Sequence, residues 1–328
     1  MAAVTYIEAI TSALAEEMRR NPEVFVFGED VGPYGGVFKA TRGLYDEFGQ
    51  DRCFDTPISE NLIIGLAVGA SMVGMRPVAE IQFADFLTCG WDQIVQQLAK
   101  LRYRSGGGLT CPATVRVSCG AEIGGGLYHS QTNEAWLVHN PGLVVMAPAT
   151  AYDAKGMLKA ALRGDDPVVY LEHKKLYRSI KEEIPDSDYT VDWRKAVVRR
   201  RGRDVTIVAY QLMMHRALEA AEELAEENIE AEVIDLRTLL PLDRETVAQS
   251  VQKTGRLVVV HESPRTGGVG AEIVAVVNEE CFEFLEAPPA RVTSPDVPPV
   301  PFAETMERFV IPQKEDIKKA VRRAVDWA

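Results

Sequence analysis

The sequence predicts an α/β protein with two domains, each a mostly parallel sheet flanked by helices. Short apolar runs typical of buried strands alternate with segments of helical spacing along most of the chain. The 328 residues correspond to about two domains at roughly 150 residues each. A charge-dense segment with neither period, from about residue 177 to 204, divides the two series. We therefore expect a first domain over 1–185, a linker over 186–203 and a second domain over 204–328.

The first domain is expected to open with an amphipathic helix, because Ile7, Ile10, Leu14 and Met18 recur at helical spacing. A buried strand over 24–27 follows and stops at a glycine, and a glycine-rich loop comes next. A long apolar helix is expected over 59–75, with a serine as its N-cap. The later elements are expected as strand, helix, strand, strand, helix and strand, over 78–81, 92–104, 114–117, 143–146, 152–163 and 168–171.

The second domain repeats the alternation of strand and helix. Three strand–helix pairs and a closing helix are expected over 205–209 and 214–227, 231–235 and 244–254, 257–260 and 269–281, and 314–327. Such an alternation implies parallel strands joined by right-handed crossovers, with helices on both faces of the sheet.

Composition and charge exclude several classes of protein. There are 36 Lys and Arg against 48 Asp and Glu, so the net charge of −12 lacks the basic footprint of a nucleic-acid-binding protein. A membrane span needs about 20 apolar residues, whereas the uncharged stretch 61–75 is short and the stretch 135–152 contains two prolines. The N-terminus has no basic region before an apolar one, and five scattered cysteines without a C-x-x-C pair indicate free thiols. Both features favour a cytoplasmic protein.

The common nucleotide-binding and hydrolase motifs are absent. The glycine clusters at 124–126 and 267–270 lack the third glycine of G-x-G-x-x-G, and neither a P-loop nor G-x-S-x-G occurs. Metal-ligand spacing is also missing among the histidines, so four of them are expected to be structural: His139, His173, His215 and His261.

More specific information comes from six strings of residues, at 56–60, 79–86, 101–107, 126–131, 152–156 and 233–238. They read TPISE, AEIQFADF, LRYRSGG, GLYHSQ, YDAKG and VIDLRT. In this order and spacing they resemble the beta subunit of the thiamine-diphosphate-dependent decarboxylating component of 2-oxo acid dehydrogenase complexes. The resemblance covers nearly the whole chain, from Gly28 to the C-terminal helix.

The resemblance implies a pyrimidine-binding first domain and a second domain of the transketolase C-terminal type. It also implies a heterotetramer of two alpha and two beta chains, with the cofactor bound between an alpha and a beta chain. In the family the alpha chain supplies the diphosphate and Mg²⁺ site through a Gly-Asp-Gly motif, which this sequence lacks. The chain would thus provide half of an active site, unlike single-chain transketolases.

Glu60 is the first candidate for a catalytic residue. Its place in the first turn of a helix is also explained by the helix dipole alone. The helix is apolar and rich in glycine, however, which predicts burial, and a buried carboxylate needs a partner. The resemblance supplies that partner, the N1′ nitrogen of the aminopyrimidine, and implies acid–base catalysis relayed through the cofactor.

His129, in a loop after three glycines, is the second catalytic candidate. A lone loop histidine is usually a surface or hydrogen-bonding residue. In the family this histidine faces the substrate and the incoming lipoyl group, and it gives or takes a proton during acyl transfer. Relatives often continue with Ser-Pro-Glu-Ala where this chain has Thr132-Asn133-Glu134-Ala135, so the loop is expected to have a different shape.

The resemblance implies two further sets of residues. The cofactor is expected to contact Glu29, Ile58, Ser59, Glu60, Gln82 and Phe86. The substrate is expected to contact Phe83, Phe86, Leu87, Thr88, Cys89 and His129. For Glu29 a capping or loop role is an equal alternative, and for Phe86 simple core packing is compatible with ring contact.

Some members of the family bind K⁺ through backbone oxygens. The matching positions here are Ala113, Thr114, Ala161, Gly164 and Asp166. Backbone ligation leaves no signature in the side chains, so this expectation depends on the resemblance alone.

The function implied is decarboxylation of a 2-oxo acid and transfer of the acyl group to a lipoyl group on an acyltransferase component. The strings around His129 and over 79–86 favour a branched-chain substrate such as 2-oxoisovalerate. Phe86 stands where many branched-chain members have Tyr, so pyruvate or acetoin stays open as the substrate. A non-catalytic docking subunit and a transketolase-like transferase are the alternatives of a different class.

Overall fold

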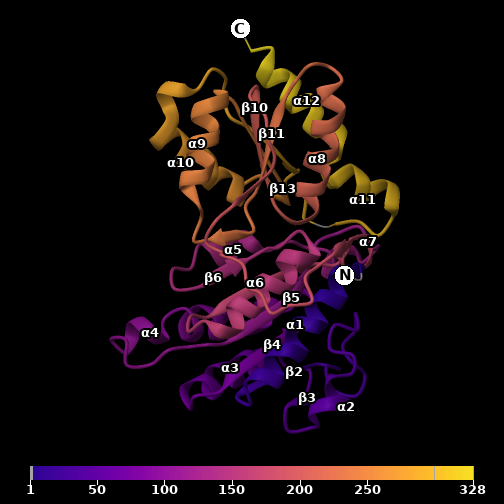
Figure 1. The fold of residues 1–328 in the computed structure, drawn as a ribbon, viewed down its shortest axis with the longest axis vertical. Helices are drawn as coiled ribbons and strands as arrows, with labels where there is room; N and C mark the ends of the chain where they lie inside the picture. Colours follow the sequence, from indigo (N-terminus) through magenta and orange to yellow (C-terminus); the bar gives the residue numbers. More distant parts are fainter. Residues whose placement is uncertain (1–2, 299, 328) are drawn as a thin grey trace.

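The computed structural model describes residues 3–298 and 300–327 and contains two α/β units stacked end to end (Figure 1). The first unit is built on a seven-stranded sheet of order β12-β6-β7-β5-β4-β2-β3. All neighbours in this sheet are parallel except β12, which is antiparallel to β6. The strands are β2 (Val24–Gly28), β3 (Cys53–Asp55), β4 (Arg76–Ile81), β5 (Thr114–Cys119), β6 (Val144–Met146), β7 (Val168–His173) and β12 (Thr238–Leu240).

Helices cover both faces of this first sheet. On one face α1 (Tyr6–Arg20) packs along α6 (Ala151–Arg163), and α7 (Leu176–Ser179) lies beside α1. On the other face lie α3 (Glu60–Met72) and α5 (Glu134–Val138). Shorter pieces complete the unit: α2 (Leu44–Phe48), η1 (Ala84–Gly90), η2 (Gln93–Leu98), α4 (Leu101–Arg104) and η3 (Gly126–Tyr128).

The second unit has a five-stranded sheet of order β14-β13-β10-β11-β9, parallel except for the edge strand β9. Its helices α9 and α10 lie on one side of the sheet, and α8 and α12 lie on the other (Figure 1). The bounds are β9 (Val197–Arg200), β10 (Val205–Ala209), α8 (Gln211–Ala225), β11 (Ala231–Asp235), α9 (Arg244–Thr254), β13 (Leu257–Pro264), α10 (Val269–Cys281), η4 (Phe282–Phe284), β14 (Ala290–Ser294), α11 (Glu304–Val310) and α12 (Lys314–Val325). The predicted fold class, two units of mostly parallel sheet flanked by helices, is confirmed.

Several segments differ from the sequence predictions. Within the charge-dense segment, β8 (Lys181–Glu183) pairs with β1 (Ala3–Thr5), and β9 forms the edge of the second sheet. The expected linker over 186–203 therefore includes a strand, which the pattern concealed because its last two residues are arginines. The helix expected over 92–104 is divided into the π-helical η2 and the short α4. Its buried residues Ile94, Leu98 and Leu101 have ordinary helical spacing, so the pattern could not reveal the π turn.

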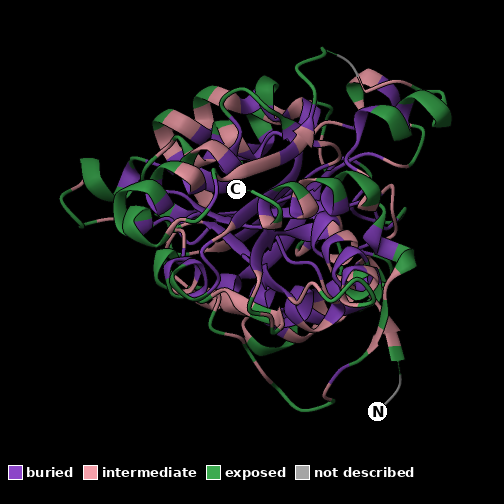
Figure 2. Ribbon diagram, turned by 90° about the horizontal axis from the view of Figure 1, so that it is seen from above, coloured by how far each residue is buried: buried purple, intermediate pink, exposed green. Residues whose placement is uncertain are grey.

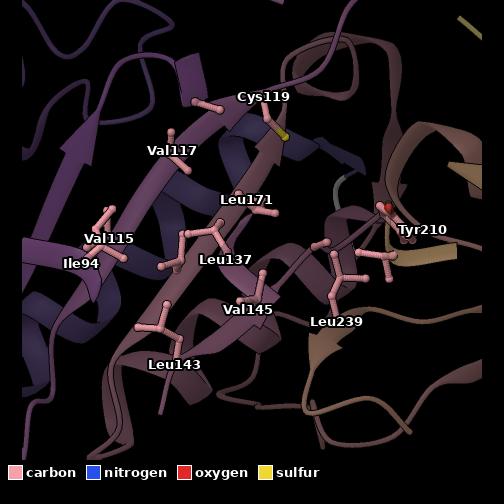
Figure 3. Packing of buried hydrophobic residues seen from close by; sticks show 14 of the residues in the cluster. Ile94, Val115, Val117, Cys119, Leu137, Leu143, Val145, Leu171, Tyr210 and Leu239 are labelled. Atoms are coloured by element: carbon pink, nitrogen blue, oxygen red, sulfur yellow. The ribbon is translucent and has the colours of Figure 1, made fainter. Parts of the chain in front are cut away.

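The two units share one hydrophobic core. Tyr210 and Leu239, from the second half of the sequence, lie beside Val145 and Leu171 of the first sheet (Figure 3). Buried residues fill the centre of the molecule, and exposed residues lie around its rim (Figure 2). Because strand β12 also joins the first sheet, the second unit is fixed to the first rather than tethered by a linker.

The apolar helix α3 is buried on one face only, which corrects the expectation that it is buried as a whole. Its inner face packs Ile63, Ile64 and Ala67 into the core. Its outer face presents an apolar stripe, which consists of Leu62, Leu66, Gly69 and Val73 and is exposed in the single chain. No described helix is both long and apolar enough to cross a membrane.

Candidate active site

The candidate residues gather at the carboxyl edge of the first sheet. Strand β2 leads into Glu29, β3 leads toward Glu60, and β4 leads into Gln82. Strand β5 leads into the loop that carries His129, and β7 leads into Lys174. The order β7-β5-β4-β2-β3 places these five segments side by side. In open parallel sheets, ligands bind at this edge.

Two carboxylates form one side of the site. Glu29 is buried, and its Oε1 atom has no hydrogen-bond partner among the described residues. Burial raises the pKa of the Glu29 carboxyl, and the nearby carboxylates of Glu60 and Asp30 raise it further. The backbone oxygen of Glu29 accepts a hydrogen bond of 3.3 Å from Gln82 Nε2. A ligand that donates a hydrogen bond to Glu29 Oε1 would therefore stabilise this buried carboxyl group.

Glu60 begins helix α3 and is half-buried. The helix is capped by Ser59, whose Oγ accepts from the backbone N–H of Leu62 at 3.4 Å. Ile58, just before the cap, is 85% exposed. Glu60 is thus fixed by a helix terminus with its carboxylate accessible beside the buried Glu29, an arrangement that fits the aminopyrimidine of the implied cofactor.

An aromatic cluster forms the opposite side of the site. The His129 ring lies edge-on to Phe83 at 4.5 Å between centroids, and edge-on to Phe86 at 5.6 Å. Phe83 and Phe86 are 5.9 Å apart, also edge to face. All three are partly exposed, so a polar imidazole stands between two apolar rings at the surface of the site.

The other residues expected at the substrate are not all brought to this cluster. Leu87 is 1% exposed within the hydrophobic core, so the expectation that it contacts the substrate is not supported. Thr88 and Cys89 are exposed on the same 3₁₀ turn. Thr88 opens onto a pocket of about 670 Å³ that Trp91 and Trp136 also line.

Sequence analysis missed a group of buried polar residues behind the aromatic cluster. Lys174 is 4% exposed, and its Nζ lies 5.7 Å from the Phe83 ring centroid with no hydrogen-bond partner among the described residues. Burial lowers the pKa of Lys174 to about 8. Asp85 is also buried, and burial raises the pKa of its carboxyl. The charged string Glu-His-Lys, which ends strand β7 and follows its apolar residues, was the signal that could have revealed this group.

Arginine side chains contact two of the residues expected to hold K⁺. The Arg76 guanidinium donates to the backbone oxygen of Gly164 at 2.6 Å and pairs with Asp165 at 2.8 Å. Arg102 pairs with Asp166 at 3.2 Å. One of the backbone oxygen atoms that the resemblance assigned to K⁺, that of Gly164, thus accepts from an arginine. The K⁺ site at Ala113, Thr114, Ala161, Gly164 and Asp166 stays a prediction of the resemblance.

Because Arg76 supplies the positive charge here, the thermal midpoint of the protein is expected to be the same in KCl and in NaCl. The measurement is thermal unfolding of the purified protein at equal ionic strength in the two salts. A midpoint several degrees higher in KCl alone would show that K⁺ binds, as the resemblance implies.

Two family models together match most of the chain. Residues 2–180 match the transketolase pyrimidine binding domain, and residues 194–317 match the transketolase C-terminal domain. The first domain type implies thiamine diphosphate as the cofactor.

Curated relatives match over the full length of both chains. The chain is 46% identical to the 2-oxoisovalerate dehydrogenase subunit beta of Bacillus subtilis. It is also 46% identical to the pyruvate dehydrogenase E1 component subunit beta of that organism, and 45% identical to that of Staphylococcus epidermidis.

A solved structure described as the inactive beta4 tetramer of a split-gene transketolase superposes with a TM-score of 0.80, at 27% identity over 99% of each chain. Its identity is well below that of the dehydrogenase subunits. The chain therefore belongs to the family of beta subunits of the decarboxylating components of 2-oxo acid dehydrogenase complexes, which are oxidoreductases.

Proposed function

We propose that this chain, with an alpha chain, decarboxylates a branched-chain 2-oxo acid such as 2-oxoisovalerate and passes the acyl group to a lipoyl group of an acyltransferase. The observation that carries the proposal is the convergence of Glu29 and Glu60 with the ring cluster of Phe83, Phe86 and His129 at one sheet edge. The carboxylates suit a cofactor, and the ring cluster suits a small apolar substrate.

Glu60 would hold a proton at the N1′ nitrogen of the pyrimidine, and Glu29 would accept a hydrogen bond through its unpartnered oxygen. Gln82, just after β4, and Phe86, in η1, would contact the ring. Ile58 and Ser59 would border it at the start of α3. When bound, thiamine diphosphate supplies the carbon nucleophile and the electron sink for decarboxylation. The alpha chain would supply the diphosphate and Mg²⁺ contacts.

His129 would give or take a proton at the reacting oxygen and sulfur atoms during acyl transfer. Phe83 and Phe86 fix the imidazole from two sides, at 4.5 and 5.6 Å. Their rings would also exclude water from the reacting centre, which strengthens electrostatic interactions there.

The apolar stripe on α3 indicates where the alpha chain docks. The stripe begins two residues after Glu60 and runs from Leu62 to Val73, which is 79% exposed. A continuous exposed apolar surface of this kind marks a protein interface. Since the cofactor site is completed by the alpha chain, the chain that covers α3 would be the alpha chain of an assembly of two alpha and two beta chains.

Substrate preference is the finer part of the proposal. We expect the assembly to have a higher kcat/KM for 2-oxoisovalerate than for pyruvate or acetoin. A pocket difference of a few methylene groups changes kcat/KM by about 10- to 200-fold. Steady-state dye reduction with each substrate measures the ratio, and a preference for pyruvate would retain the mechanism but overturn the branched-chain assignment.

A transketolase-like transferase is the second candidate, because a split-gene transketolase has a similar beta chain. The absence of a diphosphate-binding motif therefore does not separate the two functions. The identities of 46% and 27% favour the dehydrogenase.

All five cysteines are free thiols, which supports a cytoplasmic location.

A further inference from the structure

The His129 loop, defined here as residues 120–132, is closed at its base. It leaves strand β5 after Cys119 and returns to helix α5 at Glu134. The backbone N–H of Gly120 donates to the oxygen of Gln131 at 3.2 Å, which joins the two ends. Three consecutive glycines, at 124–126, lie near the centre of the loop, so the conformation of the histidine depends on how the base is held.

Glu262, from strand β13 of the second unit, accepts hydrogen bonds from both ends of this loop. Its Oε2 atom accepts from the backbone N–H of Ala121 at 3.3 Å and from Thr132 Oγ1 at 3.1 Å. Both carboxylate oxygens lie 3.0 Å from His173 Nε2. Glu262 is 6% exposed, so these donors replace its hydration.

The hydrogen bonds also define the tautomer of His173. The backbone N–H of Lys175 donates to His173 Nδ1 at 3.2 Å, so that nitrogen carries no proton. The proton is therefore on Nε2 and points at Glu262. Burial alone would raise the pKa of Glu262, but His173, Arg216 and the Ala121 N–H outweigh it and lower the pKa to about 2. The carboxylate stays charged and accepts from Ala121, Thr132 and His173.

Other groups of the second unit support the same loop. Glu307 accepts from the backbone N–H of Glu122 at 2.7 Å, and Arg216 pairs with the Glu122 side chain. A Cβ at Gly126 would lie 2.3 Å from the Phe302 ring, so the ring packs directly on the loop backbone. The second unit thus holds the loop at several points, and Glu262 is bonded to both of its ends.

We infer that Glu262 is a positioning residue for the reaction: from the second domain, it fixes the base of the loop that presents His129 to the substrate. The inference depends on the proposed role of His129. It gives the C-terminal unit a part in catalysis besides packing. A misplacement of about 1 Å in a catalytic group costs up to about 100-fold in rate.

The test is a double-mutant cycle on the alpha–beta assembly with Glu262→Gln and His129→Ala. Glu262→Gln replaces one carboxylate oxygen with an NH₂ group, which is a donor. That group would face another donor, either His173 Nε2 or the Ala121 N–H and Thr132 hydroxyl, and so would disturb the loop. We expect E262Q to lower kcat about 10- to 100-fold with an unchanged KM for the 2-oxo acid. In the H129A background, E262Q should lower kcat by less than about threefold, because the loop then has no histidine to position.

Two variants keep the test decisive. Thr132→Val removes one donor with little change of shape, and it should give a smaller loss of kcat that also vanishes in the H129A background. Asp235→Asn is the matched control, since Asp235 is a buried carboxylate of the second unit that pairs with Arg199 and not with the loop. Its effect on kcat should be small and the same in both backgrounds.

The outcomes separate the inference from the proposed function. If H129A keeps full activity, the role of His129 and the inference both fail. If H129A is impaired but the losses of H129A and E262Q multiply, only the inference fails, because Glu262 then acts on stability alone. If E262Q does not assemble, the T132V cycle decides by the same criterion.

Discussion

Glu60→Gln is expected to lower turnover of the alpha–beta assembly by about 10²- to 10⁴-fold, the range for removal of an acid–base group. The variant keeps the size of the side chain and its place in the first turn of α3. It loses the carboxylate that would hold a proton at the pyrimidine of the cofactor. Affinity for thiamine diphosphate should change much less than kcat, which calorimetric titration of the cofactor and steady-state dye reduction measure separately.

Glu8→Gln is the matched control for this experiment. Glu8 is also a first-turn carboxylate, at the start of α1, where it completes a capping box with Thr5. If Glu60 only stabilises a helix terminus, the two variants should lose similar small amounts of stability and no activity. Unchanged turnover of E60Q would also favour a non-catalytic docking subunit.

Arg116→Met is expected to destabilise the protein by about 3–5 kcal/mol, the cost of removing one partner from a buried ion pair. Arg116 lies in the centre of the first sheet and is 1% exposed. It donates to Glu172 at 2.7 and 2.8 Å and to Glu80 at 2.6 Å. Without it two carboxylates stay buried, one of which keeps only the Tyr177 hydroxyl at 2.7 Å.

Thermal unfolding of the assembly measures the effect, which should lower the midpoint by about 10 °C. The triple variant Glu80→Leu, Arg116→Met, Glu172→Leu is the control, because replacing a whole buried network with apolar residues is often neutral. It should recover most of the lost stability. A single variant no less stable than the native protein would mean that the network is hydrated rather than buried.

The central strands and long helices could be predicted because each has a continuous apolar run or a clear helical period. Strands β4, β5, β10 and β13 are buried over nearly all of their residues. Most of these residues are therefore apolar, and buried charged ones such as Arg116 and Glu80 form ion pairs. The missed strands are short or lie at a sheet edge: β1, β3, β8, β9, β12 and β14. Such strands are held by their neighbours and carry little pattern of their own.

The site divides in the same way. Glu60, Phe83 and His129 belong to strings that resemble a known family, and the structure brings Phe83 and His129 into contact. Glu262 lies 130 or more residues from Ala121 and Thr132, to which it bonds. No local period or motif in the sequence predicts such a contact, because the contact depends on how the two units pack. The family resemblance also implied a K⁺ site, at which the Gly164 oxygen accepts from Arg76 in this chain.

The most direct test of the account is whether this chain and an alpha chain together act on 2-oxo acids. The measurement is dye reduction by the co-purified assembly with thiamine diphosphate and Mg²⁺, set against cleavage of a donor ketose phosphate. The account predicts reduction that depends on 2-oxoisovalerate or pyruvate, with none from either chain alone and no ketose cleavage. Ketose cleavage without any 2-oxo acid turnover would contradict it and identify a transketolase-like transferase instead.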